Sequence, residues 1–315
     1  MKALVFDEKI FIADLPKPAR KENESLIKIL VAGICNTDLE IIKGYMGYKG
    51  VLGHEFVGIV EDSGNHTLIN KRVVGEINIG CGKCDFCLQG LSRHCQNRSV
   101  IGILAKQGVF AQYITLPDAN LCLVPDSIPD EHAVFVEPLA AALEILEQVK
   151  IIPATSVAII GDGKLALLIL QVIQLLGVHC VLFGKHEDKL LIAQNLGANT
   201  ESTTKKYKRV FDLVIEASGK KEGLLKALEL LKPRGQLVLK STFHGKVNLN
   251  FAGLVVDEIT LIGSRCGPFA PAIRLLEKEL IRIDPLIAKV FPFDDAIAAF
   301  DYAQSGHLKV LLNYK

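Results

Sequence analysis

The sequence has no excess of charge of either sign. Its 36 Lys and Arg residues nearly balance 35 Asp and Glu residues, which gives a formal net charge of +1 at pH 7. Proteins that bind nucleic acid or an anionic membrane through their overall field carry a clear basic excess. We therefore expect neither partner. The short basic run at 205–209 is too small for a polyanion site, and we expect it to be a solvated loop.

Cysteine is also sparse, and no secretion signal is visible. Eight cysteines in 315 residues are too few for the disulfide framework of a small secreted protein. Residues 1–7 contain no signal-peptide core. Four of the cysteines fall within fifteen positions, which favours thiolates that share a metal ion over disulfide bridges. These features together predict a cytoplasmic protein.

One segment without charge, residues 165–184, is long enough to span a bilayer. Gln171, Gln174 and His179 interrupt it, and Gly177 divides it into a helix-like half and a strand-like half. A buried helix followed by a central parallel strand has the same composition. We therefore expect no membrane span.

The order of apolar segments predicts two domains, as does the length. Residues 1 to about 135 hold short apolar runs broken by Gly, Pro and Asn, which is typical of an irregular, mostly β domain. Beyond residue 138, helix and strand patterns alternate, which predicts parallel βαβ units. We expect one domain of 1–138 with 267–315, and a dinucleotide-binding domain of 139–266. The expected strands are 26–31, 56–60, 112–115, 157–160, 180–183, 213–215, 236–239, 260–262, 290–293 and 309–312, and the expected helices are 139–150, 165–176, 188–196, 223–231 and 294–305, with one more after 268.

A glycine turn follows the strand expected at 157–160. Residues 161–166 read Gly-Asp-Gly-Lys-Leu-Ala. In such a turn the first glycine permits a tight bend, the second lets a pyrophosphate approach, and a small third residue lets helix and strand pack closely. The helix start offers its N–H groups to the phosphates. We expect a dinucleotide to contact Gly161, Gly163, Lys164 and Leu165; the alternative is an ordinary βα turn that contains glycines.

The end of the second strand indicates which coenzyme is bound. Sites that prefer NAD place an Asp or Glu there to bind the ribose 2′-hydroxyl. Here the strand ends in Gly184, Lys185 and His186, which would admit and neutralise a 2′-phosphate. This favours NADP(H) over NAD(H). Alternatively, Lys185 and His186 are exposed loop residues, and Glu187 or Asp188 reaches the ribose.

Two groups of metal-binding side chains lie in the first domain. The spacing Cys81-x2-Cys84-x2-Cys87-x7-Cys95 provides four thiolates, the set that closes around a structural zinc ion. Cys35 and His54 instead form a mixed set, which in catalytic sites leaves one position open. A third ligand must come from the fold, and the best candidate is Glu137.

These motifs resemble those of the zinc-containing medium-chain dehydrogenase/reductase superfamily, which includes alcohol, polyol and threonine dehydrogenases. The resemblance covers essentially the whole chain through residues 33–38, 53–55, 80–95, 137–139 and 161–166. It implies an α/β protein with a mostly-β GroES-like catalytic domain and a Rossmann domain, whose doubly wound parallel sheet binds the coenzyme. It also implies two zinc ions per chain, one catalytic and one structural. A glutamate in the place of Glu137 is similar to the polyol and threonine branch.

The resemblance also implies roles for the residues around the catalytic zinc ion, which would act as a Lewis acid on the substrate oxygen. Thr37 would relay the alcohol proton, and Asp38 would orient His54. Glu55 would lie beside the metal and exchange with water or with the glutamate ligand. Glu40 stands where many relatives have the histidine that ends the proton relay. Alternatively, Thr37 caps a turn and Asp38 is a helix N-cap.

By position, Lys240 and Ser241 resemble a segment that contacts nicotinamide, and Lys309 resembles a basic residue that meets the pyrophosphate. The sequence therefore predicts a zinc- and NADP(H)-dependent oxidoreductase of alcohols or polyols, or of the matching carbonyl compounds. The alternative is a non-catalytic zinc-lobe binding or regulatory protein of the same fold. By analogy we expect a homodimer or homotetramer that pairs through the strand near 259–262.

Overall fold

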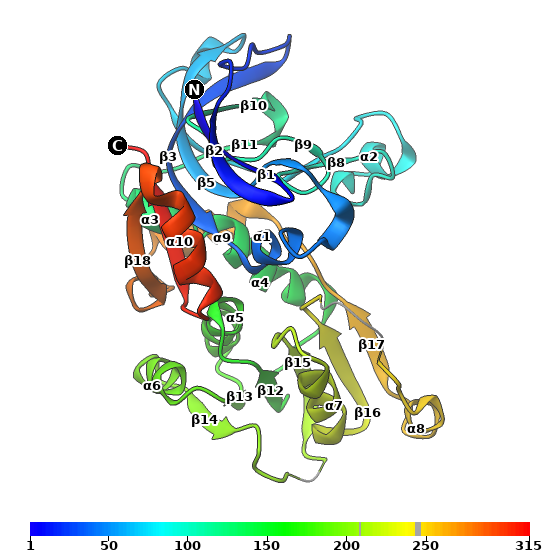
Figure 1. The fold of residues 1–315 in the computed structure, drawn as a ribbon. Helices are drawn as coiled ribbons and strands as arrows, with labels where there is room; N and C mark the ends of the chain where they lie inside the picture. The colour runs from blue at the N-terminus through cyan, green and yellow to red at the C-terminus, as the bar shows by residue number, and fades with distance from the viewer. Residues whose placement is uncertain (208, 243–246) are drawn as a thin grey trace. The chain divides into compact units, whose positions relative to one another are not determined.

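The computed structural model describes residues 1–207, 209–242 and 247–315, which form two compact units (Figure 1). The β-rich unit comprises Met1–Glu137 and Phe269–Lys315, and the α/β unit comprises Pro138–Pro268. These limits differ from the expected ones by one residue at the first boundary and two at the second. Lys208, part of the expected basic loop, lies outside the described residues.

The main sheet of the β-rich unit has seven strands, and β3 (Glu24–Ile34) lies at its centre. Nearly every residue of β3 is buried, and its second half, residues 29–34, is a continuous apolar run rather than an alternating one. Its neighbours β5 (Glu55–Ser63) and β19 (Lys309–Asn313) are both antiparallel to it. The register opposes Gly33 to Glu55 on one side and to Leu311 on the other, so the end of β3 lies beside the start of β5 and the middle of β19. The other strands of this sheet are β6 (Arg72–Gly75), β10 (Tyr113–Pro117), β11 (Leu121–Leu123) and β18 (Ile287–Pro292).

Smaller elements complete the β-rich unit. Two three-stranded sheets have the orders β2-β1-β4 and β7-β8-β9. Their strands are β1 (Lys2–Asp7), β2 (Lys9–Asp14), β4 (Gly50–Val51), β7 (Asn78–Ile79), β8 (Ser99–Ile101) and β9 (Ala105–Lys106). The helices are α1 (Asn36–Ile41), α2 (Asp85–Leu88), α3 (Asp130–Ala133), α9 (Phe269–Glu277) and α10 (Ala296–Gln304), with short 3-10 turns at Tyr45–Gly47, His66–Leu68, Ser92–His94, Asp118–Asn120, Asp284–Leu286 and Phe293–Asp295. Helix α4 (Val136–Gln148) begins in this unit and continues into the next.

The α/β unit contains a six-stranded parallel sheet of order β14-β13-β12-β15-β16-β17 (Figure 1). This order reverses beside β12, as in doubly wound dinucleotide-binding sheets, and the expected fold class is confirmed. The strands are β12 (Val157–Ile160), β13 (Cys180–Gly184), β14 (Asn199–Ser202), β15 (Phe211–Glu216), β16 (Leu231–Leu239) and β17 (Thr260–Gly263). The helices are α5 (Lys164–Gln174), α6 (Glu187–Asn195), α7 (Lys221–Leu230) and α8 (Phe251–Val256).

The uncharged segment at 165–184 forms most of α5 and all of β13. Residues Ala166 to Ile173 of α5 are buried, as are all residues of β12 and β13. The lack of charged residues in this segment therefore reflects burial on both faces of a parallel sheet. Within the described part of the chain, no helix has the length and apolar content needed to cross a membrane.

Candidate metal centres and coenzyme turn

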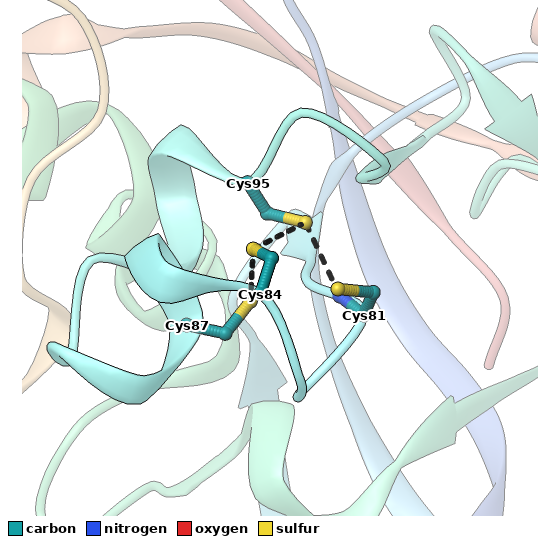
Figure 2. A group of neighbouring side chains, drawn as sticks. All are labelled: Cys81, Cys84, Cys87 and Cys95. Atoms are coloured by element: carbon teal, nitrogen blue, oxygen red, sulfur yellow. Dashed lines mark hydrogen bonds between the residues drawn. The ribbon is translucent and has the colours of Figure 1, made fainter.

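Four cysteines of the β-rich unit converge on one point (Figure 2). Their Sγ atoms all lie within 4.8 Å of one another, and Cys84 Sγ lies 3.6 Å from Cys87 Sγ and 3.7 Å from Cys95 Sγ. These separations exceed a disulfide bond but suit thiolates around one ion. All four expected ligands are thus brought together, and the all-sulfur set fits a structural zinc ion.

Local backbone holds these thiols in place. Cys84 caps the start of α2, and the N–H of Cys81 donates to Cys95 Sγ at 3.4 Å. Backbone N–H groups, first that of Lys83, lower the pKa of Cys81 to about 6, whereas burial raises the pKa of Cys87 to about 11. Cys81 therefore loses its proton more readily than Cys87.

A second cluster forms where β3, β5 and α1 meet. Cys35 caps α1 directly after β3, while Glu55 is the first residue of β5 and His54 directly precedes it. One ligand atom from each of these three residues lies within 4.8 Å of the others. A Cβ on Gly33 would lie 2.7 Å from Glu55 Oε2, so only glycine leaves room for this carboxylate.

Glu55 has one oxygen paired and one without a partner. Its Oε2 accepts from Lys309 Nζ, and both side chains are buried. Its Oε1 is buried and has no hydrogen-bond partner among the residues that the structure describes. An orphaned buried carboxylate oxygen is costly unless a donor or a cation satisfies it. Because Glu55 belongs to the cluster of Cys35 and His54, the donor set fits a zinc ion that keeps an open position.

The second residue of α4, Glu137, is the expected third ligand and is half-buried. Burial raises its pKa to about 7; His54 and Lys309 oppose this rise and Glu55 adds to it. These interactions place Glu137 near the cluster, but the carboxylate that the structure brings within 4.8 Å of Cys35 and His54 is Glu55. Glu137 as a ligand stays a prediction.

Asp38 organises the backbone of this centre. Its carboxylate accepts the N–H of Cys35 at 2.8 Å and that of Gly53 at 3.2 Å. His54 Nδ1 faces Asp38 Oδ1 at 3.3 Å without a well-aligned hydrogen bond. Burial opposes charge on His54, but Asp38 and Cys35 outweigh it and raise the pKa of His54 well above its ordinary value. Cys35 rather than Asp38 is the N-cap of α1.

The expected relay residues lie on α1. Thr37 Oγ1 lies 3.8 Å from Cys35 Sγ and accepts a hydrogen bond from this thiol. Glu40 accepts from Lys43 Nζ at 3.0 Å in an exposed pair. Lys309, expected at the pyrophosphate, has no exposed surface and pairs with Glu55. The relay role of Glu40 and the pyrophosphate contact of Lys309 stay predictions.

In the α/β unit, the glycine turn has the geometry that its sequence predicts. Gly161 has φ +125°, and a Cβ there would lie 2.8 Å from Ala217 O, so no other residue fits. Gly163 caps α5, and a Cβ there would meet no atom within 4 Å. The backbone at Gly163, followed by Lys164 and Leu165, is therefore open to a ligand at the start of the helix.

The structure corrects one premise of the coenzyme prediction. Neither Lys185 nor His186, the two residues directly after β13, is a carboxylate, but the carboxylate of Asp162, from the glycine turn, lies there in space. Its Oδ2 accepts the N–H groups of Lys185 at 2.6 Å and His186 at 2.8 Å. The end of β13 after Gly184 is therefore not free of negative charge.

Sequence reasoning also missed Glu216, which is buried at the end of β15. It accepts from Ser218 N–H at 2.8 Å and from the hydroxyl of Ser241, while Ser241 Oγ accepts the N–H of Gly219 at 2.9 Å. It thus holds two turns at the carboxyl edge of the sheet, where ligands bind such folds. Lys240 Nζ donates to Arg265 O at 2.6 Å. A carboxylate that ends an apolar strand is the signal that could have found Glu216.

Comparison with known proteins decides the family. The model of the alcohol dehydrogenase GroES-like domain matches residues 21–126, and that of the zinc-binding dehydrogenases matches residues 165–278. The chain belongs to the zinc-containing medium-chain dehydrogenase/reductase superfamily. It is accordingly an oxidoreductase of that superfamily, and the resemblance drawn from its motifs is confirmed.

Relatives in this superfamily cover almost the whole chain. D-arabitol-phosphate dehydrogenase of Enterococcus avium is 31% identical over 98% of this chain and 94% of its own. Galactitol-1-phosphate dehydrogenase of Escherichia coli is 28% identical, with a TM-score of 0.90 over 99% of this chain and 100% of its own. A zinc-binding dehydrogenase from Sinorhizobium meliloti 1021, bound to NADP, is 28% identical, with a TM-score of 0.90 over 99% of this chain and 98% of its own.

Proposed function

We propose that the protein is a zinc-dependent oxidoreductase that transfers a hydride between the hydroxyl group of an alcohol or polyol and a nicotinamide dinucleotide. The same site would reduce the matching aldehyde or ketone. One observation carries the proposal: Cys35, His54 and Glu55 each place a ligand atom within 4.8 Å of the others, and the buried Oε1 of Glu55 has no hydrogen-bond partner among the described residues. That set suits a cation with an open coordination position.

At this centre Cys35 and His54 would hold the zinc ion, with Glu55 or Glu137 as the carboxylate ligand. When bound, zinc supplies Lewis acidity to the substrate oxygen and the coenzyme exchanges the hydride. Thr37 would accept the hydroxyl proton of the substrate, since its Oγ1 is 3.8 Å from a ligand sulfur. Asp38 would keep His54 oriented.

A second zinc ion is proposed for Cys81, Cys84, Cys87 and Cys95. Four thiolates leave no open position for substrate. This ion would hold the segment 81–95 in shape, because α2 and the 3-10 turn at Ser92–His94 are too short to be stable alone.

Gly161, Gly163, Lys164 and Leu165 would bind the pyrophosphate of the coenzyme at the start of α5, with Lys240 and Ser241 near the nicotinamide. The charge at the end of β13 does not support the expected preference for NADP(H). That prediction depended on the absence of a carboxylate after β13, and Asp162 provides one there.

The proposed substrates are polyols or their phosphates. Support comes from two relatives named for phosphorylated polyols, D-arabitol phosphate and galactitol 1-phosphate. The test is a panel of alditols, alditol phosphates, simple alcohols and L-threonine, scored by reduced-coenzyme absorbance with NAD⁺ and NADP⁺. Turnover that disappears on zinc removal and returns with zinc supports the proposal, and no turnover with any compound in either direction counts against it. A non-catalytic role is not favoured, because the relatives are named dehydrogenases.

We also propose that the chain pairs with a second copy through β17. This strand ends the six-stranded sheet, and Leu261 on it is 41% exposed. Neighbouring α8 exposes Phe251, Val255 and Val256. An open strand edge beside apolar side chains favours pairing with another chain. Light scattering that gives a monomer mass at micromolar concentration would refute this arrangement.

A further inference from the structure

Asp162 follows β12 in sequence, but its carboxylate is bound at the end of β13. In addition to the two N–H groups of Lys185 and His186, the imidazole of His186 contacts it. His186 Nδ1 lies 3.0 Å from both carboxylate oxygens. The Asp162 side chain is 10% exposed, so its carboxylate is largely buried but keeps a small area open to solvent.

The last residue of β13, Gly184, fits this carboxylate. A Cβ on Gly184 would lie 2.8 Å from Asp162 Cβ and Oδ2 and 2.6 Å from Leu190 Cδ2. Atoms do not approach so closely, so a side chain at position 184 would displace Asp162. The Asp162 carboxylate therefore explains why position 184 is glycine, and space for a 2′-phosphate is not needed to explain it.

Asp162 is ionised where it lies. Burial alone would raise its pKa, but the hydrogen bonds from His186 and Lys185 outweigh burial and hold the pKa of Asp162 below its ordinary value. The N–H groups after β13 that would serve an incoming anion already bind this carboxylate. The first turn of α6 adds Glu187 and Asp188, and His186 is paired with Asp162.

The end of the second strand is where the adenosine ribose lies in dinucleotide-binding sheets. A carboxylate there accepts hydrogen bonds from ribose hydroxyls and repels a 2′-phosphate. We propose that Asp162 is a specificity residue that excludes the 2′-phosphate, so that the protein binds NAD(H) in preference to NADP(H). This rests on the proposed function in that a dinucleotide must bind at the glycine turn.

The test measures binding rather than turnover. The zinc-loaded protein is titrated with NADH and NADPH by nicotinamide fluorescence, and with 5′-AMP and 2′,5′-ADP by calorimetry. We expect the natural chain to bind NADH at least roughly tenfold more tightly than NADPH, and 5′-AMP at least roughly tenfold more tightly than 2′,5′-ADP. In Asp162→Asn the ratio of the two affinities within each pair should fall to within about threefold, chiefly because the ligands with a 2′-phosphate bind more tightly than they do to the natural chain.

Glu222→Gln is the matched control, since it removes an exposed carboxylate from the first turn of α7; its ratio should equal that of the natural chain. If the natural chain prefers NADPH, or if the affinity ratio is unchanged in Asp162→Asn, this inference is wrong, but the proposed function is not affected. If the variant does not fold, the ratio of the natural chain still decides. Failure to bind any of the four ligands overturns the proposed function as well.

Discussion

Lys309 forms an ion pair with Glu55 although the two residues are 254 positions apart in the sequence. They come from β19 and β5, which flank β3 on opposite sides. Both side chains are 1% exposed, so water solvates neither charge. The pair binds Oε2 of Glu55, and Oε1 of this cluster residue has no hydrogen-bond partner among the described residues. A structural contact between distant strands thus orients a candidate metal ligand.

Removing one partner of this pair should be strongly destabilising. We expect Lys309→Met to lower the free energy of unfolding by about 3 kcal/mol, because it leaves the Glu55 carboxylate buried without its counter-charge. Denaturant unfolding measures this. The double variant with Glu55→Gln should recover part of the loss. Lys2→Met, which breaks an exposed pair with Asp294, is the control and should have no measurable effect. A loss in Lys309→Met no larger than in the control would contradict the buried pair.

The four-cysteine cluster should act on stability rather than on chemistry. Cys84→Ser removes one thiolate from a closed site, so we expect one zinc ion less per chain and a melting temperature lower by on the order of 10 °C. Cys122→Ser, a half-buried thiol outside both clusters, should change neither. Metal analysis and calorimetry on both variants give the answer. An unaltered melting temperature in Cys84→Ser would rule out a structural zinc ion there.

The stability of the α/β unit should depend on pH through Asp212. Burial would raise its pKa, but Lys232 Nζ at 2.8 Å and the Ser156 hydroxyl at 2.6 Å outweigh burial and lower the pKa to about 2. This value lies below the unfolded value of about 3.9, so the stabilisation is present above pH 4 and is lost as the pH falls toward 2.

Asp212→Asn should therefore lower the free energy of unfolding at pH 7 by about 1 kcal/mol or less, since the pair is partly exposed. The variant and the natural chain should converge as the pH falls below about 4. Urea unfolding across this range measures the difference between the two chains. If the difference in the free energy of unfolding stays constant or grows in acid, the ionised Asp212 is not the source of this stabilisation.

The fold was largely predictable because its central strands are continuous apolar runs, and burial imposes such runs on both faces of a parallel sheet. The edge strand β14 was missed for the same reason. Its residues, Asn199–Ser202, are polar, and it is held by backbone pairing to β13 rather than by side-chain burial. Apolar periodicity cannot detect a strand that buries little.

The candidate site was predictable only where its spacing is local. The four cysteines lie within one short segment, so their convergence follows from the sequence. The geometry of Glu55 depends instead on the register of β3 against β5 and on Lys309 from the far end of the chain. Asp162 reaches across from one strand end to the next, and no motif within the chain records that contact.

The most direct test of the account is the zinc content and turnover of Cys35→Ser, measured on the same preparation as the natural chain. Because Cys35 is at the open cluster and not in the four-cysteine site, we expect the variant to keep its melting temperature and one zinc ion per chain. Its kcat/KM should fall by roughly a thousandfold or more. Full turnover with one zinc ion per chain would contradict a catalytic metal at Cys35, His54 and Glu55.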